Sequence, residues 1–179
     1  APPAPPLTAD GLHLPEYVAT CALAEGESFT RGAHEFEGAL GLAPEWRDGA
    51  CDDGCQKWVS ACLLAHANAL GVEVPIWLRA DHPALGDGAD APAGFTYQEG
   101  AFYGDVFREA GPLMYACVGR GLVHDGEAGT IVQIENVDEY LHMRLCSLGE
   151  ECGLTSTGIC QAVAGAATCD EDAGADGAF

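Results

Sequence analysis

Nine cysteines among 179 residues constrain this chain more than any other feature of its sequence. No pair of them forms the CxxCH motif of a haem site or the paired CxxC motifs of a zinc site. So many cysteines without a metal motif are typical of an oxidised, secreted domain that disulfides hold together. Because nine is an odd number, at least one thiol stays free or pairs with another chain. The nine positions are Cys21, Cys51, Cys55, Cys62, Cys117, Cys146, Cys152, Cys160 and Cys169.

The charge balance excludes two classes of partner. The chain carries 7 Lys and Arg against 28 Asp and Glu, a formal net charge of −21 at pH 7. Nucleic acids bind through Lys and Arg that neutralise phosphates, and anionic membrane surfaces attract the same residues. No apolar run approaches the length of about 20 residues that a transmembrane helix needs. We therefore predict no nucleic-acid partner and no membrane insertion.

Composition divides the chain into three parts. Residues 1–15 form a Pro-rich arm that is expected to be extended. Residues 16–169 form a disulfide-rich globular domain, and residues 170–179 an acidic C-terminal tail. The first residues, APPAPPLTADG, are typical of a mature N-terminus left after a signal peptide is cleaved. This pattern predicts a secreted protein, either extracellular or on the cell surface.

Hydrophobic periodicity predicts a small, single α+β domain that is mainly β. The clearest helix covers about 54–70, with Asp52 or Asp53 as its N-terminal cap and Gly71 as its stop. A shorter helix is expected over about 138–146. A proline marks one of the expected strands, 72–80, as an edge strand. The expected strands cover about 17–23, 27–37, 72–80, 94–98, 112–118 and 129–135.

Helix geometry limits the disulfide pattern. Cys55 and Cys62 share one face of the longer helix, but seven residues advance the axis by about 10 Å. A disulfide needs Cα atoms within about 7 Å, so these two cysteines should not pair with each other. In the C-terminal part, either Cys146–Cys152 or Cys152–Cys160 is predicted to close a local loop. The remaining connectivity stays open.

Few residues are candidates for chemistry. Cys62 and His66 have the i,i+4 spacing of a catalytic pair, but Cys62 lies on the apolar face of its helix, which favours a structural role. Asp170, Asp172 and Asp176 repeat the 1, 3, 7 spacing of calcium loops, without the oxygen ligand at position 5 or the closing Glu. The alternative for these aspartates is a solvated acidic tail. Calcium is therefore the cofactor that these aspartates would bind, if any, and no catalytic residue is assigned.

Several segments resemble a group of bacterial proteins. CQKWVSACLLAHANALGVEVPIWLRADHPAL and QEGAFYGDVF are similar to segments of uncharacterised secreted, cysteine-rich proteins of myxobacteria and related bacteria. MYACVGRG and RLCSLGEECG fit the same group, and the resemblance covers most of 17–160. It implies export and a single domain. It carries no activity, cofactor or site residue to this chain.

These observations favour a secreted structural protein that self-assembles, such as an extracellular filament subunit. The N-terminal arm would pack on a neighbouring copy, and the odd cysteine would bridge two chains. The first alternative is an extracellular calcium- or glycan-binding module. The second is a small secreted hydrolase, which requires a cleft that joins His82 or His124 to an acidic residue.

Overall fold

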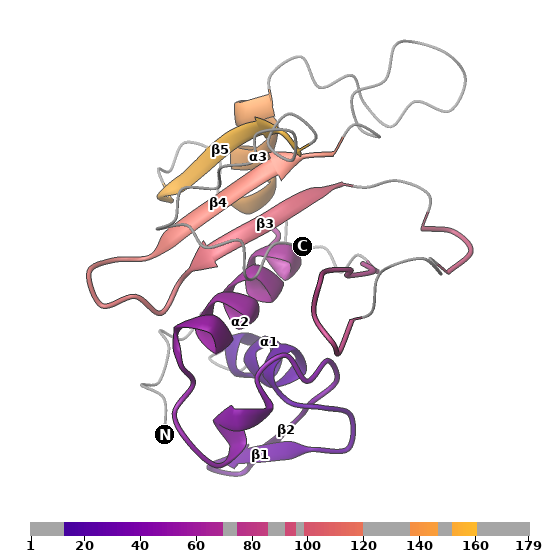
Figure 1. Cartoon of the computed structure of the whole chain (residues 1–179), viewed down its shortest axis with the longest axis vertical. Coiled ribbons are helices and arrows are strands. Elements are labelled where there is room, and N and C mark those ends of the chain that lie inside the picture. Colours follow the sequence, from indigo (N-terminus) through magenta and orange to yellow (C-terminus); the bar gives the residue numbers. More distant parts are fainter. Residues whose placement is uncertain are drawn as a thin grey trace.

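A computed structural model provides the structure of the chain, with a cartoon in Figure 1. It describes residues 13–69, 75–85, 92–95, 99–119, 137–146 and 152–160. In these ranges the helices are α1 (His13–Ala22), α2 (Asp53–His66) and α3 (Val137–Leu145), with a 3₁₀ turn, η1, at Pro44–Arg47. The strands are β1 (Ser28–Arg31), β2 (His34–Glu37), β3 (Gly100–Asp105), β4 (Leu113–Val118) and β5 (Leu154–Ile159).

Helix α1 corrects the prediction of a strand over 17–23. Pro15, Ala19 and Ala22 are buried at i, i+4 and i+7, which is the spacing of one helix face. The short segment also fits period two, which is why its sequence pattern predicts a strand. Pro15 is tolerated because it lies in the first turn of the helix. Backbone N–H groups there have no acceptor within the helix, so the N–H that proline lacks costs no hydrogen bond. Since α1 begins at His13, the predicted arm ends earlier than residue 15, and residues 1–12 lie outside the described ranges.

The segment after α1 returns to cap it. β1 and β2 form an antiparallel hairpin in which Phe29 and Phe36 stack with ring centroids 5.0 Å apart. The chain then passes the C-terminus of α1, where the amides of Leu42 and Ala43 donate to the carbonyls of Cys21 and Ala22. The last carbonyls of a helix have no partner within it, so these bonds stabilise the helix end. The predicted strand 27–37 is therefore a hairpin of two short strands.

Helix α2 is the centre of the fold, between α1 and the three-stranded sheet in Figure 1. Val59 and Cys62 pack in a cluster with α1 and the segment that caps it. Leu64 and Ala65 pack in a second cluster with residues of the sheet and of α3. Because the helix is covered on more than one side, even Ser60 is fully buried. Its hydroxyl donates to the Gln56 carbonyl at 2.7 Å and accepts from the Val106 amide at 2.9 Å.

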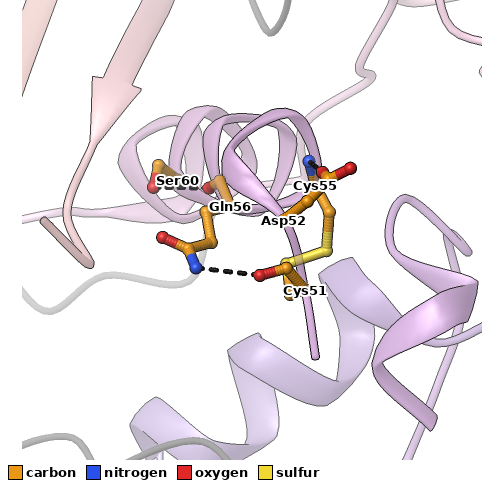
Figure 2. Close-up of a disulfide and its surroundings, with 5 residues drawn as sticks. All are labelled: Cys51, Asp52, Cys55, Gln56 and Ser60. Atoms are coloured by element: carbon orange, nitrogen blue, oxygen red, sulfur yellow. Dashed lines mark hydrogen bonds between the residues drawn. A yellow bond between two sulfur atoms is a disulfide. The ribbon is translucent and has the colours of Figure 1, made fainter. Parts of the chain in front are cut away.

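The start of α2 agrees with the prediction and its end does not. The Asp52 carboxylate accepts from the Cys55 amide at 2.9 Å, and Cys51 forms a disulfide with Cys55 across the same turn (Figure 2). The Gln56 amide adds a bond to the Cys51 carbonyl. The helix ends at His66 rather than residue 70, and Gly71 lies outside the described residues.

β4 is the middle strand of the second sheet, antiparallel to β3 and parallel to β5. It confirms the strand predicted over 112–118. β3 was not predicted as a strand because two of its six residues are glycines. Gly104 has a φ of 140°, and a Cβ there would collide with the Leu113 carbonyl of β4. Only glycine suits that close approach of two backbones.

The other predicted elements have mixed outcomes. α3 confirms the helix predicted over 138–146. The described part of the expected strand 72–80, residues 75–80, is not a strand. At the expected strand 94–98, residues 92–95 form a turn and residues 96–98 lie outside the described ranges. The expected strand 129–135 also lies outside them.

Four disulfides connect the described residues. The predicted α+β class is confirmed. Of the described residues, about 33% are in helices and about 26% in strands, so the β emphasis of the prediction is corrected, mainly by α1. Cys55 and Cys62 do not pair with each other, and Cys146–Cys152 closes the predicted local loop. Four disulfides are typical of an oxidising, extracellular environment. The pairs are Cys21–Cys62, Cys51–Cys55, Cys117–Cys160 and Cys146–Cys152.

Cys169, the ninth cysteine, lies outside the described residues. The described helices include none that is long and apolar enough to cross a membrane.

Candidate functional site

Among the described residues, one group brings three metal-type ligands together. Sγ of Cys21, Sγ of Cys62 and a ring nitrogen of His66 all lie within 4.8 Å of one another. α1 provides Cys21, whereas α2 provides Cys62 and, one turn later, His66. Both cysteines are fully buried, and His66 is partly exposed. The i,i+4 spacing seen in the sequence therefore does place Cys62 and His66 side by side.

Hydrogen bonding fixes the state of the His66 ring. Its Nδ1 lies 2.9 Å from the Cys62 carbonyl oxygen and 3.6 Å from Cys62 Sγ. A carbonyl oxygen only accepts, so Nδ1 carries the proton and donates it. The Tyr17 ring packs beside the imidazole with centroids 5.3 Å apart, and Tyr17 itself is 38% exposed. The partly exposed His66 ring is therefore where solvent reaches this group.

Burial lowers the pKa of His66. The bond to the Cys62 carbonyl opposes this shift, and the positive charge of Arg144 adds to it. His66 is therefore neutral at pH 7, with a lone pair on one nitrogen. In the oxidised chain both sulfur atoms belong to the disulfide, so neither acts as a nucleophile or as a metal ligand.

A second polar cluster joins α3 to the rest of the core. Arg144 Nε and one of its terminal nitrogens donate to the two carboxylate oxygens of Glu99, at 2.6 and 3.2 Å. The same terminal nitrogen donates to the Ala65 carbonyl of α2 at 2.8 Å, and the guanidinium lies 5.2 Å from the Phe102 ring centroid. This cluster was not foreseen, because its members are 45 and 79 residues apart in the sequence.

Tyr140 completes the cluster and has an altered acidity. Its hydroxyl donates to the Glu99 carboxylate at 3.3 Å. Burial and the negative charge of Glu99 raise the pKa of Tyr140 to about 12, against the opposing charge of Arg144. The phenol is thus held in its neutral, donating form.

We expect Tyr140 to ionise two pH units later than a free tyrosine, whose pKa is about 10. Because the folded pKa is raised, its contribution to stability is complete below pH 10 and is lost as the pH rises towards 12. Rapid spectrophotometric titration of the phenolate band checks this, with Tyr140→Phe as the reference. The difference between the two titration curves should rise near pH 12, and a difference that rises near pH 10 contradicts the assignment.

The face of the sheet opposite α2 carries an aromatic pair. Tyr103 of β3 and Tyr115 of β4 stack with centroids 5.2 Å apart and ring planes 11° apart. The Tyr103 hydroxyl donates to Thr157 Oγ1 of β5 at 3.2 Å. Both tyrosines are partly exposed. Flat aromatic surfaces with hydroxyl donors bind sugars or proline-rich chains by stacking and hydrogen bonding.

Most of the residues proposed for other chemistry lie outside the described ranges. Asp170, Asp172 and Asp176, the calcium candidates, lie outside the described residues, as does His124. His82 packs against the Trp58 ring at 4.8 Å, and burial lowers its pKa while the charge of Glu45 opposes this. Among the described residues, no carboxylate is hydrogen-bonded to His82.

Comparisons with known proteins identify no relative: no family model matches the chain, and no curated protein or solved structure matches it significantly. The function must therefore be inferred from the residues and their arrangement alone.

Proposed function

We propose that this chain is an exported structural protein that assembles with copies of itself into extended filaments. The disulfide pattern carries the proposal. The eight described cysteines pair with one another, so Cys169 has no cysteine partner left in its own chain. In an oxidising environment an odd cysteine pairs between molecules, and a second copy supplies the matching thiol.

One cysteine joins only two chains, so a filament needs a second contact. In this proposal the N-terminal arm of one copy makes that contact with the Tyr103–Tyr115 pair of its neighbour. Proline-rich segments dock on aromatic surfaces because their extended backbone is already ordered and its carbonyls accept hydrogen bonds. Tyr103 and Tyr115 provide such rings on one sheet face. The Tyr103 hydroxyl donates to Thr157 and the Thr157 hydroxyl to the Ala116 carbonyl, so the contact relies on the rings.

Charge favours the arm over the rest of the chain as the contacting segment. Residues 1–9, APPAPPLTA, contain no charged side chain in a protein of net charge −21. They can therefore approach another copy without adding to its repulsion. The twelve residues before α1 would span about 37 Å in polyproline II conformation. An arm that reaches into the next copy makes a head-to-tail contact, and such contacts give filaments when they do not close into a ring.

Light scattering of the native protein in saline buffer without reductant tests the proposal. We expect particles well above the 18.5 kDa chain mass. Cys169→Ser should abolish covalent dimers on a non-reducing gel while larger non-covalent particles persist. Serine in place of the arm prolines should limit assembly to covalent dimers. These are Pro2, Pro3, Pro5 and Pro6.

Met143→Ser is the matched control, because this exposed side chain lies in neither proposed contact. It should assemble as the wild type does. A wild-type monomer with a titratable Cys169 thiol would contradict the proposal and favour the binding-module alternative.

A further inference from the structure

We propose that reduction of the Cys21–Cys62 disulfide turns these two cysteines and His66 into a three-ligand site for a zinc ion. The site uses none of the residues proposed for the assembly contacts, so its test does not depend on assembly.

The distances already fit zinc on the histidine side. Zinc binds thiolate sulfur at about 2.3 Å and imidazole nitrogen at about 2.0 Å, usually in tetrahedral geometry. Two such ligand atoms then lie about 3.5 Å apart. Cys62 Sγ lies 3.6 Å from His66 Nδ1. The helix thus presents this sulfur and this nitrogen at the separation that one zinc ion requires.

The two sulfur atoms must separate when their bond is broken. In a tetrahedral zinc site they lie about 3.8 Å apart. The Cα atoms of Cys21 and Cys62 are 6.0 Å apart on two packed helices. Rotation about the Cα–Cβ bonds can therefore open the sulfur pair without separating α1 from α2.

The chemistry balances with a dithiol as the reductant. The dithiol supplies two electrons and two protons, the Cys21–Cys62 bond breaks to give two thiols, and the dithiol becomes a disulfide. Zinc then displaces the two thiol protons to solvent. His66 gives up its bond to the Cys62 carbonyl, and its proton moves from Nδ1 to Nε2 through solvent. Exchange with an external disulfide re-forms the Cys21–Cys62 bond, reduces that disulfide to a dithiol with two protons from solvent, and releases the ion.

The surroundings leave the fourth position of a tetrahedral site to solvent. Three protein ligands are at hand, and the His66 ring is partly exposed, so water can complete the site there. Three protein ligands with an open fourth position are also the arrangement of catalytic zinc sites. No other group of three such ligands occurs in the described part of the chain.

Cobalt titration of the reduced chain, followed by zinc competition, tests the site. We expect one Co²⁺ per chain, with the visible and near-ultraviolet bands of tetrahedral thiolate coordination, and its displacement by Zn²⁺. Zn²⁺ should also raise the melting temperature of the reduced chain. Cys21→Ala with Cys62→Ala should abolish the bands, and His66→Asn should weaken binding by at least about tenfold.

Cys51→Ala with Cys55→Ala is the matched control. It removes the disulfide at the start of the same helix and should leave the cobalt spectrum and affinity unchanged. If the reduced chain unfolds and its thiols bind metal without distinction, His66→Asn will bind as tightly as the wild type. That result, or bands that survive in the Cys21 and Cys62 variant, would overturn the proposal.

Discussion

Replacing Cys21 and Cys62 together by alanine is expected to lower the free energy of unfolding by about 4 kcal/mol at 25 °C. The disulfide joins residues 41 positions apart, and closing so long a loop removes much of the entropy of the unfolded chain. Alanine is the suitable replacement because both side chains are fully buried, and serine would add a hydroxyl that needs a partner. Urea denaturation of the oxidised protein measures the change.

Two other disulfides test whether loop length determines how much stability is lost. The Cys117–Cys160 bond spans 43 positions, and its removal should also cost about 4 kcal/mol. The Cys51–Cys55 bond spans 4 positions, and its removal should cost about 2 kcal/mol. Equal losses for all three pairs would contradict the entropic explanation. A larger loss for Cys21–Cys62 alone would indicate that packing of α1 on α2 contributes as well.

Local chemistry explains which elements could be predicted from the sequence. The cap at Asp52 depends on residues three positions apart, and the Cys146–Cys152 loop on residues six apart. β4 has enough large apolar residues to be recognised without knowledge of its neighbours. The sequence predicts a strand at α1 because its buried positions are Pro, Ala and one Cys, whose weak hydrophobic signal fits two periods.

Tertiary contacts determine what the sequence could not show. β3 forms although it contains glycines. At Gly104 the backbone of β4 comes so close that a side chain would not fit, so the pairing of the two strands requires glycine there. The Cys62–His66 pair was visible as an i,i+4 spacing, but its third member, Cys21, comes from a helix that was expected to be a strand. Glu99 and Arg144 meet only after α3 has packed on the core. Sequence spacing carries no information about such pairs.

Arg144→Met is expected to lower the free energy of unfolding by about 2–3 kcal/mol. The variant keeps the apolar length of the side chain, so the loss reports on the guanidinium. It removes two charge-assisted bonds to Glu99 and one bond to the Ala65 carbonyl. Only 15% of the Arg144 side chain is exposed, whereas Glu99 is 36% exposed. Water can therefore solvate the unpaired carboxylate of Glu99 in part. The expected loss of stability is accordingly smaller than for a fully buried pair.

Arg47→Met is the matched control, because Arg47 also pairs with a glutamate at close range. Its Nη1 lies 2.7 Å from Glu27, but the Arg47 side chain is 60% exposed. Water screens such a pair, so its loss should lower the free energy of unfolding far less than the loss of the Arg144 pair. Urea denaturation at pH 7 compares the two variants. If Arg144→Met costs no more than Arg47→Met, the Glu99–Arg144 pair does not join α3 to the core. We expect the double variant Arg144→Met with Glu99→Gln to regain part of the lost free energy of unfolding, because it no longer holds an uncompensated charge. If the pair does not join α3 to the core, the added Glu99→Gln change should regain nothing.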